Sequence, residues 1–445
     1  MKPRISKPFR CNGSVRSLVF GTVTLVTLLT LAVAAASDAP YEEPPISYNT
    51  AAPADAIASL QQRIDKGEAS LTRDDQHGYL EALLKELKIP VSSQTLVFSK
   101  TSFQRERISP KHPRALYFND DVYVGSIPGS DLLEVAATDA KLGVNFYTLD
   151  QSQGEQPKFV RQTDSCLQCH AGSMTRDMPG LMVRSVFTDR RGQPILSAGT
   201  FLTTDESPLK ERWGGWYVTG THGGQRHMGN VTCPDEDHAD ALDRDAGANL
   251  TDLSAKFDTA RYPSVHSDIA AVMVLVHQSE LHNRFIRASY GVRLALRDAE
   301  VMNKALGRPK DFRSDSTQSR IKSVCEPLVK GMLFCGEATL EEPVKGSSTF
   351  TSEYAARGPR DSRGRSLRDL DLQHRLLKYP CSPLIYSQTF DGLPDAAKDY
   401  VYRRLFEVLT GKDTSKDFAH LSAADRQAIL EILRDTKLGL PDEWR

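Results

Sequence analysis

Two cysteines and a histidine stand together in the segment Asp164-Ser165-Cys166-Leu167-Gln168-Cys169-His170. Cys166 and Cys169 are three residues apart, so within one helical turn their side chains lie on the same side. His170 follows directly, which brings its ring close to both thiols. This C-x-x-C-H arrangement is typical of c-type haem attachment, in which two thioether bonds hold one porphyrin and the histidine binds the iron.

The motif occurs once, so we expect a single covalently bound haem c, with Cys166 and Cys169 as attachment points and His170 as proximal ligand. Two alternatives are weaker. A redox dithiol would need a thioredoxin-like βαβ context, which the flanking sequence does not show. A zinc site would need a second close cysteine pair, and Cys325 and Cys335 are spaced too widely for one.

A glycine-rich and aromatic segment, residues 212–230, carries the candidates for the second axial ligand. Glycine lets the backbone approach a flat ring closely, and Trp and Tyr can pack on a porphyrin. Our first choice for the distal iron ligand is His227, followed by Met228 and His222. The alternative is that these side chains are structural and the distal face of the iron is open.

The first 36 residues have the pattern of a secretory signal peptide. Five basic residues and no acidic residue precede an apolar run from Leu18 to Ala36, which ends in small residues suited to cleavage. The run is also near the minimum length for a membrane span, so an uncleaved anchor formed by residues 18–36 is the alternative. We therefore expect export to the periplasm or cell envelope, either soluble after cleavage or anchored there.

The formal net charge of the chain is −1, and removing the five N-terminal basic residues takes it to about −6. A mildly acidic exported protein has no electrostatic reason to bind nucleic acid. Four further cysteines follow the motif, namely Cys233, Cys325, Cys335 and Cys381. In an oxidising compartment they could form two disulfides in any of three pairings, or they could be buried free thiols.

Residue patterns predict an α+β fold, with a β-rich segment around the motif and a helical C-terminal half. Periodicity predicts helices over 55–66 and 74–87, the second capped by Asp74, and later over 267–293, 320–334, 370–378, 396–409 and 422–437. Short aromatic and β-branched runs predict strands over 96–98, 115–118, 122–124 and 144–147, and a hairpin over 181–202 turning at Arg191-Gly192.

This pattern divides the chain into five expected regions. They are a signal peptide or anchor (1–36), a Pro- and Ala-rich linker (37–53), an N-terminal α+β region (54–160), a haem-binding segment (161–240) and a helical C-terminal region (241–445).

The motif resembles that of the c-type cytochrome superfamily. The wider chain resembles an uncharacterised group of exported, single-haem cytochrome-like proteins. The stretches that carry this resemblance are 118–125, 146–151, 161–164, 213–217 and 226–230. The resemblance implies a haem protein of the cell envelope and implies no substrate.

Taken together, the sequence favours transfer of single electrons through the bound haem to a redox partner protein or a small redox molecule. The alternative is a haem enzyme, peroxidase- or oxidase-like, with an open distal iron face. A haem-based sensor is a third reading that no sequence feature promotes. Membrane association through the N-terminal segment is left open.

Overall fold

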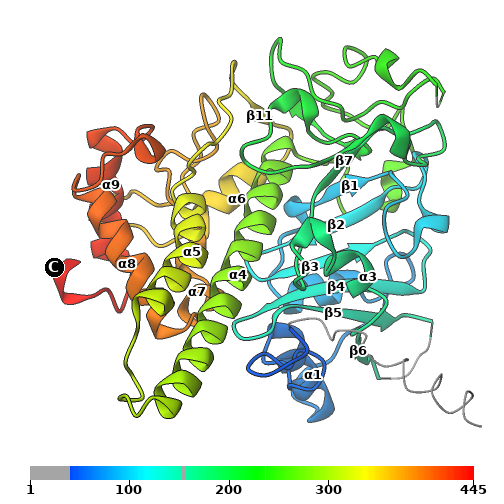
Figure 1. The fold of residues 1–445 in the computed structure, drawn as a ribbon. Helices are drawn as coiled ribbons and strands as arrows, with labels where there is room; N and C mark the ends of the chain where they lie inside the picture. The colour runs from blue at the N-terminus through cyan, green and yellow to red at the C-terminus, as the bar shows by residue number, and fades with distance from the viewer. Residues whose placement is uncertain (1–40, 153–155, 236, 445) are drawn as a thin grey trace, which may run out of the picture.

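A computed structural model describes residues 41–152, 156–235 and 237–444, and within them the predicted α+β fold is confirmed. A β-rich half occupies one side of the molecule and a helical half the other, with the long helix α4 (Ile269–Ala305) running between them (Figure 1). The expected signal peptide or anchor, residues 1–36, lies outside the described residues.

The largest sheet has seven strands in the order β6-β5-β4-β3-β2-β1-β9, and every neighbouring pair is antiparallel. All four predicted strands are present. β4 was not predicted from the sequence, although its buried residues alternate with half-exposed ones over most of its length. The strands are β1 (Thr95–Val97), β2 (Arg114–Phe118), β3 (Val122–Ser126), β4 (Leu132–Asp139), β5 (Gly143–Asp150), β6 (Phe159–Arg161) and β9 (Trp216–Tyr217).

The two faces of this sheet pack against different partners. Helices α1 (Ala56–Asp65) and α2 (Leu80–Glu86) cover one face and share a core with strand residues such as Tyr117 and Leu149. The other face, which includes Phe146, packs against α4 and the segment that contains the motif. Because strand side chains alternate between faces, the same strands serve both cores.

Smaller elements complete the β-rich half. The predicted hairpin over 181–202 is confirmed as β7 (Arg184–Val186) paired with β8 (Thr200–Leu202), and Gly192 at its turn has the positive φ expected there. β10 (Gly220–Thr221) pairs with β11 (Lys345–Gly346), which ties the segment after the motif to the C-terminal half. The strands of the large sheet come from both sides of the region border expected near residue 160, because β9 follows that border in the sequence and pairs with β1, which precedes it.

Three local predictions were wrong. The helix expected from residue 74 begins only at Leu80, because the Asp74 carboxylate accepts from the backbone of Gln76 and His77 and caps a turn instead. Residues 370–378 form no helix but a bridged turn. Residues 41–53 of the expected linker are packed on the protein, since the apolar side chains of Tyr41, Ile46 and Tyr48 are buried.

The C-terminal half is built from helices, most of them predicted. α4 ends 12 residues later than expected, and the short helices α6 and α7 were not predicted from the sequence. The helices are α5 (Asp315–Met332), α6 (Phe350–Ala356), α7 (Gln388–Asp391), α8 (Asp395–Leu409) and α9 (Ala423–Thr436). As predicted, Ser422 caps α9, in a reciprocal capping box with Asp425.

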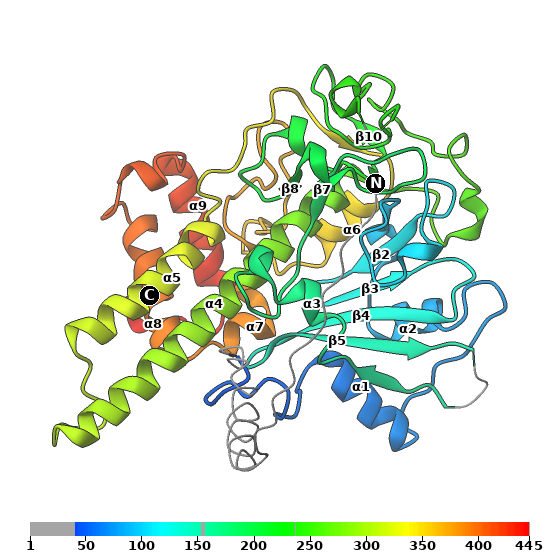
Figure 2. The same cartoon turned by 45° about the vertical axis from the view of Figure 1, so that its right-hand side comes forward.

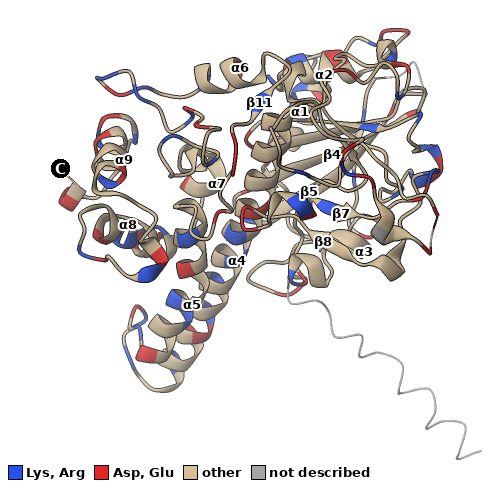
Figure 3. Ribbon diagram, turned by 90° about the horizontal axis from the view of Figure 1, so that it is seen from above, with Lys and Arg blue, Asp and Glu red and all other residues tan. Residues whose placement is uncertain are grey.

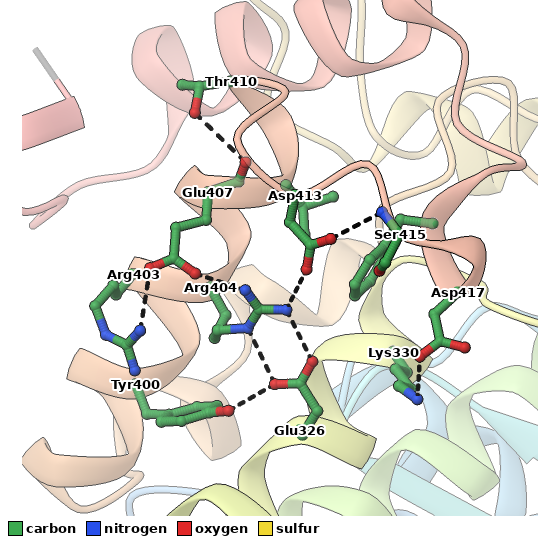
Figure 4. A network of polar contacts seen from close by, with 12 residues as sticks. Glu326, Lys330, Tyr400, Arg403, Arg404, Glu407, Thr410, Asp413, Ser415 and Asp417 are labelled. Carbon is green, nitrogen blue, oxygen red and sulfur yellow. Dashed lines mark hydrogen bonds and ion pairs between the residues drawn. The ribbon is translucent and has the colours of Figure 1, made fainter.

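A charged network joins α5 to α8 (Figure 4). The guanidinium of Arg404 donates to both carboxylate oxygens of Glu326, at 3.0 and 3.1 Å, and also to Glu407 and Asp413. The Tyr400 hydroxyl donates to Glu326 from the same helix at 2.6 Å. These bonds pair charges at the contact between two helices, where an unpaired charge would be costly.

None of the helices in the described part of the chain is long and apolar enough to cross a membrane.

Candidate functional site

The C-x-x-C-H segment forms one short helix, α3 (Leu167–His170), with Cys166 at its N-terminal cap. It follows the edge strand β6 closely and lies over the β5 side of the sheet, next to α4 (Figure 2). The carbonyl of Asp164 accepts from the amides of Leu167 and Gln168 and so starts the turn. The helical geometry places Cys166 and Cys169 on the same side, as the sequence predicted.

The imidazole of His170 is held at one nitrogen and free at the other. Its Nδ1 lies 2.9 Å from the carbonyl oxygen of Gly180, so Nδ1 carries the proton and donates. The ring also packs on Phe146 of β5, with 4.6 Å between centroids. Burial lowers the pKa of His170, which favours the neutral ring. Nε2 makes no hydrogen bond within the described residues, and its lone pair is therefore free to bind a metal.

The Gly180 carbonyl is itself fixed by α4. The Asn283 side chain pairs with the backbone of Leu181 in both directions, accepting from its amide at 2.9 Å and donating to its carbonyl at 2.7 Å. A Cβ at position 180 would lie 2.4 Å from the Asn283 oxygen, so any larger residue there would displace this side chain. The amide of Gly180 also donates back to the His170 carbonyl. This arrangement sets the direction of the imidazole.

The two motif thiols differ in exposure, Cys166 being half-buried and Cys169 exposed. Burial, with a contribution from Glu134, raises the pKa of Cys166 to about 11. Reactive redox cysteines have a lowered pKa, so this environment does not favour a catalytic dithiol. All six cysteines among the described residues are free thiols, including Cys233, Cys325, Cys335 and Cys381.

The zinc alternative gains no support from the structure. Among the described residues, one group of at least three His, Cys, Asp or Glu side chains is close enough to hold a metal ion, and it consists of Asp74, His77 and Glu81. None of these belongs to the motif, and no third or fourth protein ligand of this kind gathers around Cys166 and Cys169 in the part of the chain that the structure describes.

An ion pair that the sequence analysis missed lies on the sheet face near the motif. Arg114 of β2 pairs with Glu134 of β4, and both side chains are largely buried. The charges of this pair act on the pKa values of both Cys166 and His170. The Arg114 guanidinium lies over Gly125, where any side chain would collide with it. Arg114 Nε is buried without a partner, so this arginine has a donor to spare.

The structure does not bring the three distal candidates to the motif. No hydrogen bond or ring contact among the described residues joins His227, Met228 or His222 to α3. They follow β9, at the edge of the sheet opposite β6. His227 contacts Trp213 and His222 instead, at ring distances of 5.3 and 4.8 Å.

The two histidines already use the lone pair that a metal would need, and the methionine is buried in a contact of its own. The Gly229 amide donates to Nδ1 of His227 at 2.9 Å, and burial lowers the pKa of His227 to about 3, so Nε2 carries the proton of a neutral ring. The Asn249 amide donates to Nε2 of His222 at 3.0 Å. The sulfur of Met228 is fully buried 3.6 Å from the Ser185 hydroxyl.

A cavity of about 570 Å³ lies against the segment that follows the motif. Met174, Met178 and Met182 line one wall, and α4 and α5 form the other with charged residues that include Glu280 and Arg284. Its volume is in the range of small-molecule sites.

The motif residues fit a covalently bound haem c. A free Nε2 on a neutral histidine, a fixed ring direction and two thiols on one side of a helical turn are what such attachment needs. Comparisons with known proteins add nothing to this, since no family model, curated protein or solved structure matches the chain. The proposals below therefore rest on the sequence and on the geometry of the site.

Proposed function

We propose that this protein is an exported monohaem c-type cytochrome that transfers single electrons. The observation that carries the proposal is the His170 imidazole, which donates through Nδ1 to the Gly180 carbonyl and keeps Nε2 free beside Cys166 and Cys169. Hydrogen bonding of the remote nitrogen is the usual way in which a protein fixes the tautomer and direction of a metal-binding histidine.

A bound haem supplies a one-electron Fe(III)/Fe(II) couple. The residues of this chain hold and tune it. Cys166 and Cys169 anchor the porphyrin edge, and His170 binds the iron. Because Cys169 is exposed, a group held there would be accessible to a redox partner protein or a small redox molecule. The Arg114–Glu134 pair places fixed charges near the site, which influence the reduction potential.

Export is part of the proposal and rests on the sequence of residues 1–36. It accounts for covalent attachment, since a haem fixed by two thioether bonds is not lost by dissociation outside the cytoplasm. It also predicts that the protein fractionates with the periplasm or cell envelope.

The first experiment is expression of the full chain in a host with a c-type haem maturation system. We expect the mass of the protein to increase by one haem, and a sharp reduced α band at roughly 550 nm, which is characteristic of two thioether bonds. The double variant C166S/C169S should lose the covalent haem, while Cys335→Ser, which changes a thiol outside the motif, should retain it. Covalent haem in the double variant would overturn the proposal.

A haem enzyme with an open distal iron face is the second candidate, and a specific observation favours it. His227, His222 and Met228 follow β9, at the sheet edge opposite β6, and the acceptor nitrogens of both histidines are occupied by backbone amides. Carbon monoxide discriminates the candidates. No response of the reduced spectrum indicates a closed iron and favours electron transfer, whereas a shifted spectrum favours the enzyme.

A further inference from the structure

Helices α4 and α5 extend beyond the rest of the molecule as a helical hairpin (Figure 1, Figure 3). α4 ends at Ala305 and α5 begins at Asp315, so the residues around this connection form the tip. We define the hairpin tip as residues 301–313. Its exposure, composition and rigidity distinguish it from other surface loops.

The hairpin tip exposes large apolar side chains. Val301 is 62% exposed, Met302 56%, Leu306 52% and Phe312 43%. These are four of the twelve exposed large apolar side chains among the described residues, gathered into 12 consecutive positions. Single exposed apolar residues are ordinary, but such a cluster on a projection marks a contact surface.

Basic side chains are interleaved with these apolar ones. Lys304, Arg308, Lys310 and Arg313 are all exposed. Asp311 is the one acidic residue within the hairpin tip, and Glu300 beside it pairs with Lys310 at 3.1 Å, which leaves two positive charges in excess. The Arg308 guanidinium lies over the Phe312 ring, 5.2 Å from its centroid. Apolar and cationic groups therefore share one small surface although the chain as a whole is mildly acidic.

The hairpin tip is held in shape without any partner. The side-chain amide of Asn303, which is 3% exposed, donates to the carbonyl of Phe312 at 2.8 Å and of Lys310 at 3.3 Å. Gly307 has a φ of +62°, which lets the chain leave α4 in a tight turn. Binding through this surface would cost little ordering entropy, because the loop is already closed.

We propose that the hairpin tip docks on a lipid bilayer with anionic headgroups. Apolar side chains enter the interface while lysine and arginine stems extend to the headgroup phosphates. The positive charge of the hairpin tip favours a lipid surface over a second copy of the chain. A second copy of the chain would bring the same positive tip against the first, whereas an anionic lipid surface complements it. The proposal is independent of the haem assignment and of the N-terminal segment.

The test uses the full chain with a local reporter. Phe312→Trp places a tryptophan at the hairpin tip, and Leu438→Trp places one at a 90% exposed site in the C-terminal tail. Vesicles of phosphatidylglycerol with brominated acyl chains should quench the fluorescence at position 312 and not at 438. The readout is local, so it does not depend on whether residues 1–36 also bind the vesicles.

Further variants measure separately how the basic and the apolar side chains of the hairpin tip contribute to vesicle binding. Lys304→Gln with Arg308→Gln should weaken the quenching affinity roughly tenfold or more, while the matched surface pair Lys66→Gln with Lys210→Gln should not. Leu306→Ser should also weaken it, and vesicles of phosphatidylcholine should quench far less. Absence of quenching at 312 with both lipids would overturn the proposal. So would lipid-free self-association that Leu306→Ser abolishes, because the tip would then bind a second copy.

Discussion

The Nδ1 atom of His277 lies 2.7 Å from a carboxylate oxygen of Asp205, and both side chains are largely buried. On the other side of the ring, Nε2 lies 2.8 Å from the hydroxyl of the fully buried Ser382. Phe334 stacks on the same imidazole at 4.1 Å. These hydrogen bonds connect the loop after β8, helix α4 and the segment before α7. The three segments are far apart in sequence.

Replacing this histidine should destabilise the protein strongly. His277→Ala leaves the Asp205 carboxylate buried without its imidazole partner, and we expect a loss of about 3 kcal/mol in the free energy of unfolding. Urea denaturation measures it. The matched control is His238→Ala, which removes an exposed histidine 2.7 Å from Asp235, and it should change stability by less than about 0.5 kcal/mol. Equal effects at the two positions would contradict the prediction.

Glu337 should make the protein less stable as the pH rises. Burial and the nearby Asp205 raise the pKa of Glu337 to about 7. An unfolded glutamate titrates near 4.3. Between these values the folded state holds more protons than the unfolded state, so stability falls with rising pH until about pH 7 and then levels off.

Glu337→Gln isolates this effect because glutamine keeps an oxygen to accept from the Leu376 amide. The wild type should lose about 3 kcal/mol relative to the variant between pH 4.5 and 7.5. Unfolding curves at several pH values give the difference in free energy of unfolding between the two proteins. The contributions of the other titrating groups cancel in this difference. A difference that does not change with pH would show that Glu337 titrates normally.

Arg404 should be the most sensitive member of the α5–α8 network. Arg404→Ala leaves Glu326 without its two-bond partner and should cost about 3 kcal/mol. The neighbouring Arg403→Ala removes an exposed pair with Glu407 and should cost about 0.5 kcal/mol or less. Thermal and urea unfolding report both. Restoring stability by adding Glu326→Gln to Arg404→Ala would confirm that the unpaired carboxylate carries the cost.

The Gly180–Asn283 contact should tune a haem bound through His170. Asn283→Ala removes both bonds to the Leu181 backbone, so the Gly180 carbonyl is less well placed to accept from Nδ1. We expect the covalent haem to remain and its reduction potential to shift, measured by redox titration. A purely structural role would lower the melting temperature and leave the potential unchanged. Gly180→Ala should act in the same direction, because its Cβ would displace Asn283.

His227→Gln tests the distal candidates. Because Nδ1 of His227 accepts from the Gly229 amide inside a buried loop, we expect a loss of about 1 to 3 kcal/mol in stability and no change in the reduced haem spectrum. The carbon monoxide response should also be unchanged. A spectral shift in this variant alone would instead show that the loop rearranges and that His227 binds the iron.

Much of the fold could be predicted because its signals are local. A strand such as Arg114–Phe118 or a helix such as Ala423–Thr436 carries its pattern within a few residues. The failures are local as well. Asp74 can cap a turn or a helix with the same carboxylate, and only the neighbouring contacts decide which.

The sequence by itself determined the C-x-x-C-H motif, because the spacing of Cys166, Cys169 and His170 within one helical turn needs no distant residue. Tertiary structure alone decided what surrounds the motif. Asn283, more than 100 positions away, fixes the carbonyl that orients His170, and long-range burial occupies the nitrogens of His227 and His222. Hydrogen-bond partners and burial depend on which segments pack together, and short-range spacing carries no record of that packing.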